Sequence, residues 1–133
     1  KALRAEIAAS FEAHRQTLRV HSETAVLLHG DFKVSNLHWA ADNLPLVLDW
    51  EFAYAGPALA DVGQLFRWKP PTAFRDAFAE AYRAWGGELP SDWTRWAATF
   101  DLINLAGLLD KAPSDSRRAS DCRTRIRETL TDE

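Results

Sequence analysis

The sequence predicts an α+β domain that is mostly α-helical and carries one small β-hairpin. Apolar residues recur at helical spacing over most of the chain. Two brief apolar runs, residues 37–39 and 45–48, flank a turn-rich segment at residues 40–44, which is typical of a hairpin. At 133 residues, 47% of them hydrophobic, the chain is long enough for one domain with a substantial core.

The helical segments are expected at five places in the chain. In the first, residues 2–19, the apolar side chains of Leu3, Ile7, Phe11 and Leu18 recur on one face. The later helices are expected over residues 59 to about 69, over residues 72–85 with Thr72 as cap and Gly86-Gly87 as stop, over residues 93–111 with Ser91 or Asp92 as cap, and from about Asp115 onward. Residues 25–29 are expected to form a short buried strand or an extended segment, and residues 50–57 a loop with a turn at Gly56-Pro57.

The core is expected to come from apolar faces of these helices. Residues 93–111 are apolar on most sides, so this helix is predicted to be central and buried; its apolar residues are Trp96, Phe100, Leu102, Ile103, Leu105, Leu108 and Leu109. The helix before it presents an aromatic stripe of Phe74, Phe78, Tyr82 and Trp85. The last helix should turn Ala119, Cys122, Ile126 and Leu130 inward. Its arginines, Arg117, Arg118, Arg123, Arg125 and Arg127, could bind an anion or an acidic partner, but acidic residues alternate with them, which favours a solvated face.

Composition excludes several classes of function. The net charge of −3 gives no general attraction to nucleic acid or to anionic membranes, and no apolar run approaches the length of a membrane span. A single cysteine, Cys122, cannot form an internal disulfide, which fits a cytoplasmic protein. The chain contains no methionine and begins at Lys1, so we expect it to be a piece of a longer protein.

The chemistry-bearing residues gather around the predicted hairpin. Residues 29–36 read His-Gly-Asp-Phe-Lys-Val-Ser-Asn and lead into its first arm, and Asp49-Trp50-Glu51 follows the second. Paired strands lie about 5 Å apart, so Asn36 and Asp49 can face the same small volume. Their amide and carboxylate oxygens suit Mg²⁺, and a nearby carboxylate, Asp31, could deprotonate a hydroxyl group.

The pattern H-G-D-x-x-x-x-N followed by D-x-E resembles the aminoglycoside phosphotransferase and choline kinase-like family, which shares the protein-kinase fold. The resemblance implies that residues 1–133 are the C-terminal, catalytic lobe of such an enzyme. It implies ATP as phosphoryl donor, Mg²⁺ as cofactor and a small-molecule hydroxyl as acceptor. It also implies that Asp31 is the catalytic base and that Asn36 and Asp49 bind the metal.

Four further positions match the family pattern with less defined roles. Lys33 lies where many protein kinases place a lysine close to the transferred phosphate, and Glu51 is the second acid of the D-x-E motif. His29 is expected to pack beneath the loop, and Asp61 to brace the loop through its backbone amides. The segment around Asp61 departs from the family pattern at Pro57, where an aspartate is frequent.

The family also binds acceptors among the later helices, which makes Asp101, Asn104 and Asp110 candidates for an acceptor pocket.

The resemblance does not extend to the nucleotide-clamping lobe. Phosphoryl transfer of this kind needs a glycine-rich loop and a strand lysine over the phosphates, and the six glycines and four lysines supply neither. The isolated chain is therefore expected to be inactive or to have very weak activity.

The main alternative to an enzyme is a binding module that kept the lobe and lost the reaction. A metal-dependent hydrolase is weaker, because no His-rich or carboxylate-rich cluster accompanies Asp49. Aminoglycosides, choline-like alcohols, sugars and amino-acid hydroxyls all stay open as acceptors.

Overall fold

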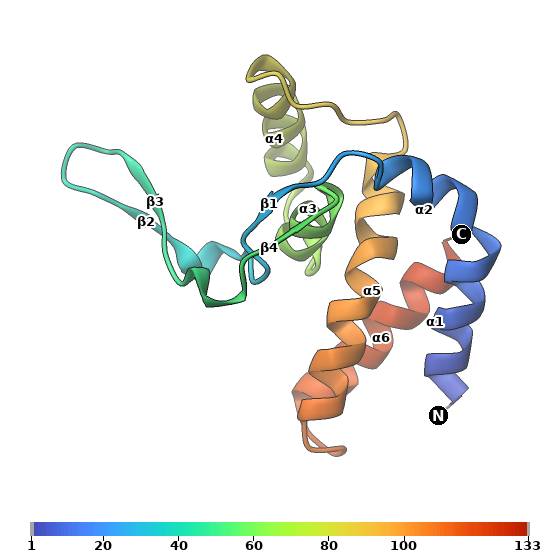
Figure 1. Ribbon diagram of the computed structural model, residues 1–133. Helices are drawn as coiled ribbons and strands as arrows, with labels where there is room; N and C mark the ends of the chain where they lie inside the picture. Colours follow the sequence, from blue (N-terminus) through green and yellow to red (C-terminus); the bar gives the residue numbers. More distant parts are fainter. Residues whose placement is uncertain (1, 133) are drawn as a thin grey trace.

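The computed structural model describes residues 2–132 and confirms a mainly helical α+β chain (Figure 1). The α-helices of the described range are α1 (Ala2–Ala13), α2 (Arg15–His21), α3 (Leu59–Phe66), α4 (Thr72–Ala84), α5 (Trp93–Lys111) and α6 (Arg117–Thr131). The strands are β1 (Val26–Leu28), β2 (Leu37–Trp39), β3 (Pro45–Val47) and β4 (Tyr54–Gly56), and two 3-10 turns are η1 (Val34–Asn36) and η2 (Trp50–Phe52). None of the helices among residues 2–132 combines the length and apolar character needed to cross a bilayer.

Helix α5 is the centre of the helical body, as the sequence predicts. It contacts α3, α6 and α1 (Figure 1), and its residues Leu102 and Leu105 are fully buried. Their side chains form one cluster with Ile7 of α1 and with Cys122 and Ile126 of α6. The inward face predicted for the last helix is therefore confirmed at its main positions. Burial of side chains of this size typically stabilises a fold by about 1.5–3 kcal/mol each.

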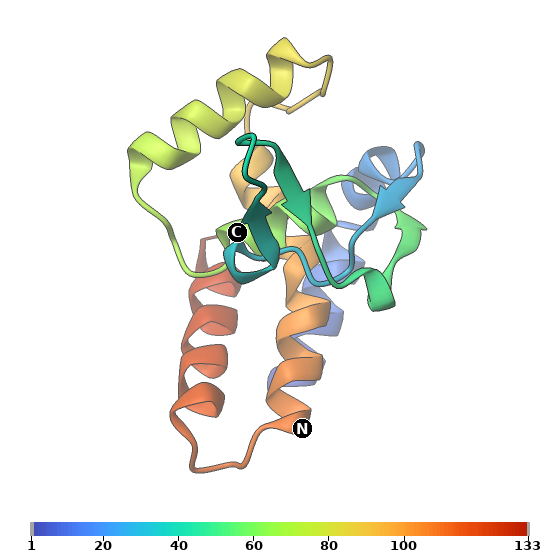
Figure 2. The same ribbon diagram turned by 90° about the vertical axis from the view of Figure 1, so that its left-hand side faces the viewer.

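The two sheets of the described chain are each a single antiparallel pair. Strands β2 and β3 form the predicted hairpin, with Leu37 opposite Val47 (Figure 2). The turn is closed by a hydrogen bond from the backbone N–H of Asn43 to the carbonyl of Ala40 (2.9 Å), with Asn43 in the left-handed conformation (φ 61°) that asparagine tolerates well.

The second sheet corrects two expectations. Residues 54–56, expected in a loop, form β4, and Leu28 of β1 lies opposite Tyr54. Gly56 lies in this strand and not in the expected turn. It allows close packing, because a Cβ there would lie 2.8 Å from the Tyr54 ring and 3.0 Å from Leu28. The prediction of a buried β1 is wrong for most of the strand, because Leu28 is 2% exposed but Leu27 is 72% exposed.

Three helix boundaries also differ from expectation. The helix expected over residues 2–19 bends at His14 (φ −103°, ψ 11°) and continues as α2 to His21. The rings of His14 and His21 both pack on Trp96, with centroids 5.4 and 5.7 Å away, so the bend keeps α2 against α5. Helix α3 ends at Phe66, before the expected end near Lys69, because the following backbone N–H groups bond three residues back, Arg67 to Gln64 (3.4 Å) and Lys69 to Phe66 (3.0 Å).

The predicted caps are only partly correct. Pro71, not Thr72, is the N-cap of α4. Asp92 occupies the N-cap of α5 without capping the backbone; its carboxylate accepts a hydrogen bond from the Trp96 indole instead (2.7 Å). Helix α6 begins two residues later than expected, where the Ser116 hydroxyl accepts from the backbone N–H of Ala119 (3.2 Å).

The aromatic stripe of α4 is not a core face over its whole length. Phe78 packs edge-on against Phe66 of α3 (5.1 Å between ring centroids), but Phe74 is 41% exposed and Trp85 91% exposed. Helix α4 lies beside the bundle rather than inside it (Figure 1), so only one side of the stripe meets a neighbour. On α5, Ile103 is likewise exposed (62%), against the prediction.

Candidate active site

The loop that precedes the hairpin is held by helix α3. Asp61, in the first turn of α3, accepts hydrogen bonds from the backbone N–H of His29 (2.6 Å) and of Gly30 (3.0 Å) through its two carboxylate oxygens. Hydrogen bonds to a charged acceptor are shorter and stronger than neutral ones. This carboxylate therefore fixes the position from which the loop starts.

Gln64, one turn further along α3, holds the next part of the loop. Its Oε1 accepts from the backbone N–H of Phe32 (2.8 Å), and its Nε2 donates to the carbonyl of Gly30 (3.0 Å). The side chain is buried, and both of its polar atoms are paired. No sequence motif pointed to Gln64, although its spacing of three residues from Asp61 places both on one helix face.

Gly30 allows the loop to pass close to the segment that returns from the hairpin. Its φ of 82° lies in the region that favours glycine, and a Cβ at this position would lie 2.2 Å from the carbonyl oxygen of Phe52. A larger residue would therefore both strain the backbone and push the two segments apart.

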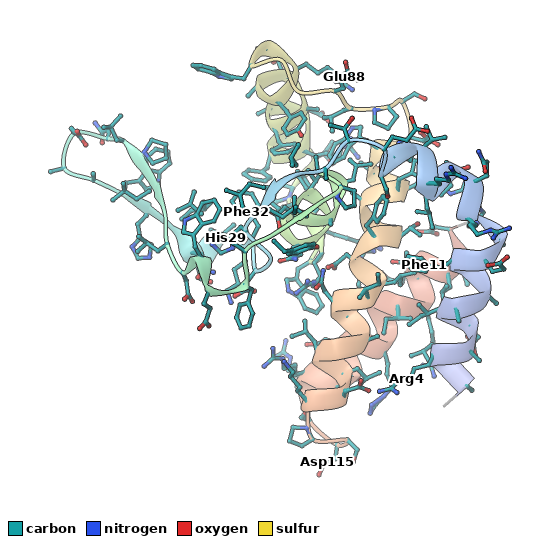
Figure 3. All side chains as sticks on the ribbon, viewed as in Figure 1. Arg4, Phe11, His29, Phe32, Glu88 and Asp115 are labelled. Carbon is teal, nitrogen blue, oxygen red and sulfur yellow. The ribbon has the colours of Figure 1, made fainter. Side chains whose placement is uncertain are left out.

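His29 connects the loop to the segment that ends at Asp49. Its buried ring lies beside Phe32 (Figure 3) and 4.9 Å from the ring of Trp50. The backbone N–H of Asp31 donates to Nδ1 (3.2 Å), so Nε2 carries the proton and donates to the carbonyl of Leu48 (2.7 Å). These bonds place His29 beneath the loop, between Asp31 and the residue before Asp49.

Asp31, Lys33 and Asn36 lie together at the end of the loop. The ammonium of Lys33 contacts Asp31 Oδ2 at 2.5 Å, and Asn36 Nδ2 donates to the Asp31 carbonyl (3.0 Å) and lies 3.4 Å from Oδ2. The Asp31 side chain is 28% exposed and that of Lys33 49% exposed, whereas Asn36 is buried. The arrangement leaves the Asp31 carboxylate open to an incoming molecule and fixes Asn36 behind it.

The structure also brings Asn36 next to the segment of Asp49. The backbone N–H of Leu48 donates to the carbonyl of Asn36 (2.9 Å), so Asp49 directly follows the residue paired with Asn36. Asp49 is exposed and left-handed (φ 71°), a strained conformation of the kind that recurs at functional sites. Glu51 is exposed on η2.

The donor set fits a magnesium ion. Because Asn36 uses its amide nitrogen on Asp31, its amide oxygen is left for a cation, and the Asp49 carboxylate does not cap η2. Mg²⁺ is commonly held by one or two side chains, with water and substrate phosphates completing its shell. Residues 2–132 contain no group of three or more His, Cys, Asp or Glu that could hold a metal without such help. The metal-binding and catalytic roles of these residues stay predictions.

The three polar residues predicted for an acceptor pocket do not form one. Asp101 is 1% exposed and binds the Arg67 guanidinium through both oxygens (2.6 and 2.7 Å). Asn104 donates to the same carboxylate (3.3 Å), and Asp110 is exposed and paired with Arg4. Burial raises the pKa of Asp101 above its ordinary value, and the hydrogen bond and charge of Arg67 counteract that rise. Asp101 therefore joins α5 to the residue that follows α3 instead of facing a substrate.

A family model described as "Phosphotransferase enzyme family" matches residues 1–99 of the 133-residue chain. The matched range contains the loop of residues 29–36, Asp49 and the bracing residues of α3. Neither a curated protein nor a solved structure matches the chain.

Proposed function

The chain belongs to the phosphotransferase enzyme family, and we propose that it supplies the catalytic base and metal ligands of an ATP- and Mg²⁺-dependent phosphotransferase acting on a hydroxyl group of a small molecule. A second, nucleotide-clamping lobe is part of this proposal. The observation that carries it is the pairing of Asn36 with Asp31, which places a candidate metal ligand directly behind a solvent-accessible carboxylate.

The proposed reaction uses the loop residues in separate roles. The acceptor hydroxyl oxygen attacks the terminal phosphorus of ATP, the bond from that phosphorus to the bridging oxygen of ADP breaks, and the hydroxyl proton passes to Asp31. Lys33, which contacts Asp31 in the free protein, can neutralise charge on the transferred phosphate. Asn36 and Asp49 would hold Mg²⁺, which neutralises charge on the nucleotide phosphates when bound.

The bracing contacts explain how the loop could keep its geometry during the reaction. Catalysis of phosphoryl transfer depends almost entirely on positioning and electrostatics. Asp61 and Gln64 hold four backbone groups of the loop from a rigid helix. The loop therefore needs little reorganisation when substrates arrive.

An Asp31→Asn variant tests the proposal in the protein as expressed from its native gene. General-base catalysis contributes about 10²–10⁴-fold, so we expect phosphate transfer to a panel of aminoglycosides, choline, sugars and hydroxyl amino acids to fall by that factor. The matched control is Asp42→Asn in the exposed hairpin turn, where the amide oxygen can still accept from the Leu44 N–H (3.3 Å).

ADP release measures the transfer, and urea unfolding checks that each variant is folded. The Asp42 variant should keep the wild-type rate. Wild-type turnover in a folded Asp31→Asn protein would exclude Asp31 as the base. Absence of transfer by the folded wild-type protein would favour the non-catalytic binding module.

A further inference from the structure

A basic cavity of about 660 Å³ lies away from the candidate active site. It is formed by the connection between α3 and α4, the first turn of α4, the first half of α5 and the last turns of α6. None of the described lining residues belongs to residues 29–51. Figure 2 shows the α3–α4 connection passing beside the C-terminal end of α6. The apolar part of the lining comes from Phe66, Pro70, Pro71 and Ala98.

Four cationic side chains line this cavity, and among the described residues 2–132 its lining contains one carboxylate, Asp132. The cations are Lys69, Arg75, Arg95 and Arg125. The whole chain, by contrast, has 19 acidic residues against 16 Lys and Arg. The described lining residues thus carry more positive than negative charge, in a protein that is acidic overall.

Neighbouring groups hold these cations at the cavity without removing them from it. Glu128 accepts from Lys69 (2.7 Å) and lies 3.4 Å from Arg125. Asp76 contacts Arg75 at 3.1 Å, and the Arg95 guanidinium stacks over the Trp96 ring, 4.6 Å from its centroid. The Lys69 and Arg75 side chains are 59% and 45% exposed, so their charged ends are accessible to a ligand.

Arg125 and Lys69 differ from what is expected of residues on a solvated surface. Arg125, expected on the exposed arginine face of the last helix, has only 14% of its side chain exposed and turns toward the cavity. Lys69 adopts a left-handed backbone (φ 47°), which costs a residue with a Cβ about 1 kcal/mol. Both residues also line a smaller adjoining hollow of about 220 Å³.

We propose that this cavity binds a small organic anion, in which a phosphate or carboxylate group is attached to an apolar body. The guanidinium groups match the planar oxygens of such an anion, and Lys69 adds a point charge. The apolar body would lie on the wall formed by Phe66 and Pro71. The site is distinct from the residues proposed for phosphoryl transfer and adds a second binding function to the chain.

Titration of the chain with phenyl phosphate and with benzoate tests this site, and benzyl alcohol is the neutral probe of the same shape. Binding is measured by calorimetry at low and high salt. The variants are Lys69→Asn, which removes the charge but keeps a residue that tolerates φ 47°, and Arg75→Gln. The matched control is Arg117→Gln, whose side chain is 95% exposed at the far end of α6.

We expect saturable binding of at least one anion and weaker binding of benzyl alcohol. Each cavity variant should weaken the anion about tenfold, as expected for the loss of one charge-assisted hydrogen bond, while the Arg117 variant binds as the wild type does. The better-bound anion identifies the charged group that the site prefers. Absence of saturable binding at millimolar anion, equal binding of benzyl alcohol, or an equal loss in the Arg117 variant would overturn the proposal. Because the readout is binding and not transfer, failure here is separate from failure of the proposed reaction.

Discussion

Replacing Gly63 with alanine tests how closely α3 packs on α5. A Cβ built on Gly63 would lie 2.0 Å from the carbonyl oxygen of Ala97 and 3.0 Å from the Cβ of Asp101. Ordinary contacts between carbon atoms are about 3.5–4.0 Å long, so the overlap exceeds an ångström and involves backbone that cannot rotate away. The two helices must therefore separate.

The expected loss combines two opposing effects. Overpacking of a buried site costs about 1–3 kcal/mol, and the backbone overlap here places Gly63→Ala at the upper end. Alanine is more favourable than glycine in a helix interior by about 1 kcal/mol, which offsets part of this loss of stability. We expect the free energy of unfolding to fall by about 2 kcal/mol on balance. Asp61 and Gln64 move with α3, so phosphate transfer should fall as well.

Gly107 of α5 provides the matched control. A Cβ there meets nothing within 4 Å, so Gly107→Ala should only gain helix propensity and stabilise the protein by about 0.5–1 kcal/mol. Urea unfolding of both variants and the wild type gives the difference between them, about 3 kcal/mol, which isolates the overlap. A Gly63→Ala protein as stable as the Gly107→Ala protein would refute the inferred contact between α3 and α5.

Three other contacts can be tested by substitution. Asp101→Leu leaves the buried Arg67 guanidinium without its carboxylate, so urea unfolding should show a loss of stability of about 3–5 kcal/mol. The added change Arg67→Met should restore most of that stability, and a double variant as unstable as the single one would contradict the pairing. Arg4 lowers the pKa of Asp110, so this pair stabilises the fold above the unfolded-state pKa and stops doing so as the pH falls through the lower folded-state pKa. Unfolding of Asp110→Asn should accordingly depend less on pH below about 4 than that of the wild type, and equal pH profiles would count against the pair. Asp61→Asn offers one oxygen to two backbone donors, and we expect a loss of about 1–3 kcal/mol together with slower phosphate transfer; wild-type stability would argue that Asp61 does not brace the loop.

Local sequence signals predicted the elements that depend on near neighbours. The bounds of α5 agree with the prediction, because polar residues and a proline mark its ends and its apolar residues are dense between them. The β2–β3 hairpin agrees for a similar reason, since its turn signal lies between two apolar arms. Both are decided within about twenty residues of sequence.

Contacts between distant segments could not be predicted in this way. Strand β4 has three residues and exists because β1, far earlier in the chain, pairs with it. The family resemblance makes Asp101 a candidate for an acceptor pocket, and no local pattern indicates that Arg67, directly after α3, binds it instead. Gln64 was missed for the same reason: its partners are backbone groups of a loop more than thirty residues away.

The β2–β3 hairpin extends away from the helical body, and its arms contact mainly each other (Figure 1). A lone two-stranded hairpin is only marginally stable in water, so its hydrogen bonds open at a free energy well below that of global unfolding. Asn36 and Asp49 lie at the ends of the two arms, and each opening event moves them apart. If the proposed metal site is correct, a cation held by both residues would have to offset the entropy of closing residues 37–48. Its affinity would therefore depend on the preorganisation of the turn at Asn43, at the opposite end of the hairpin from Asn36 and Asp49.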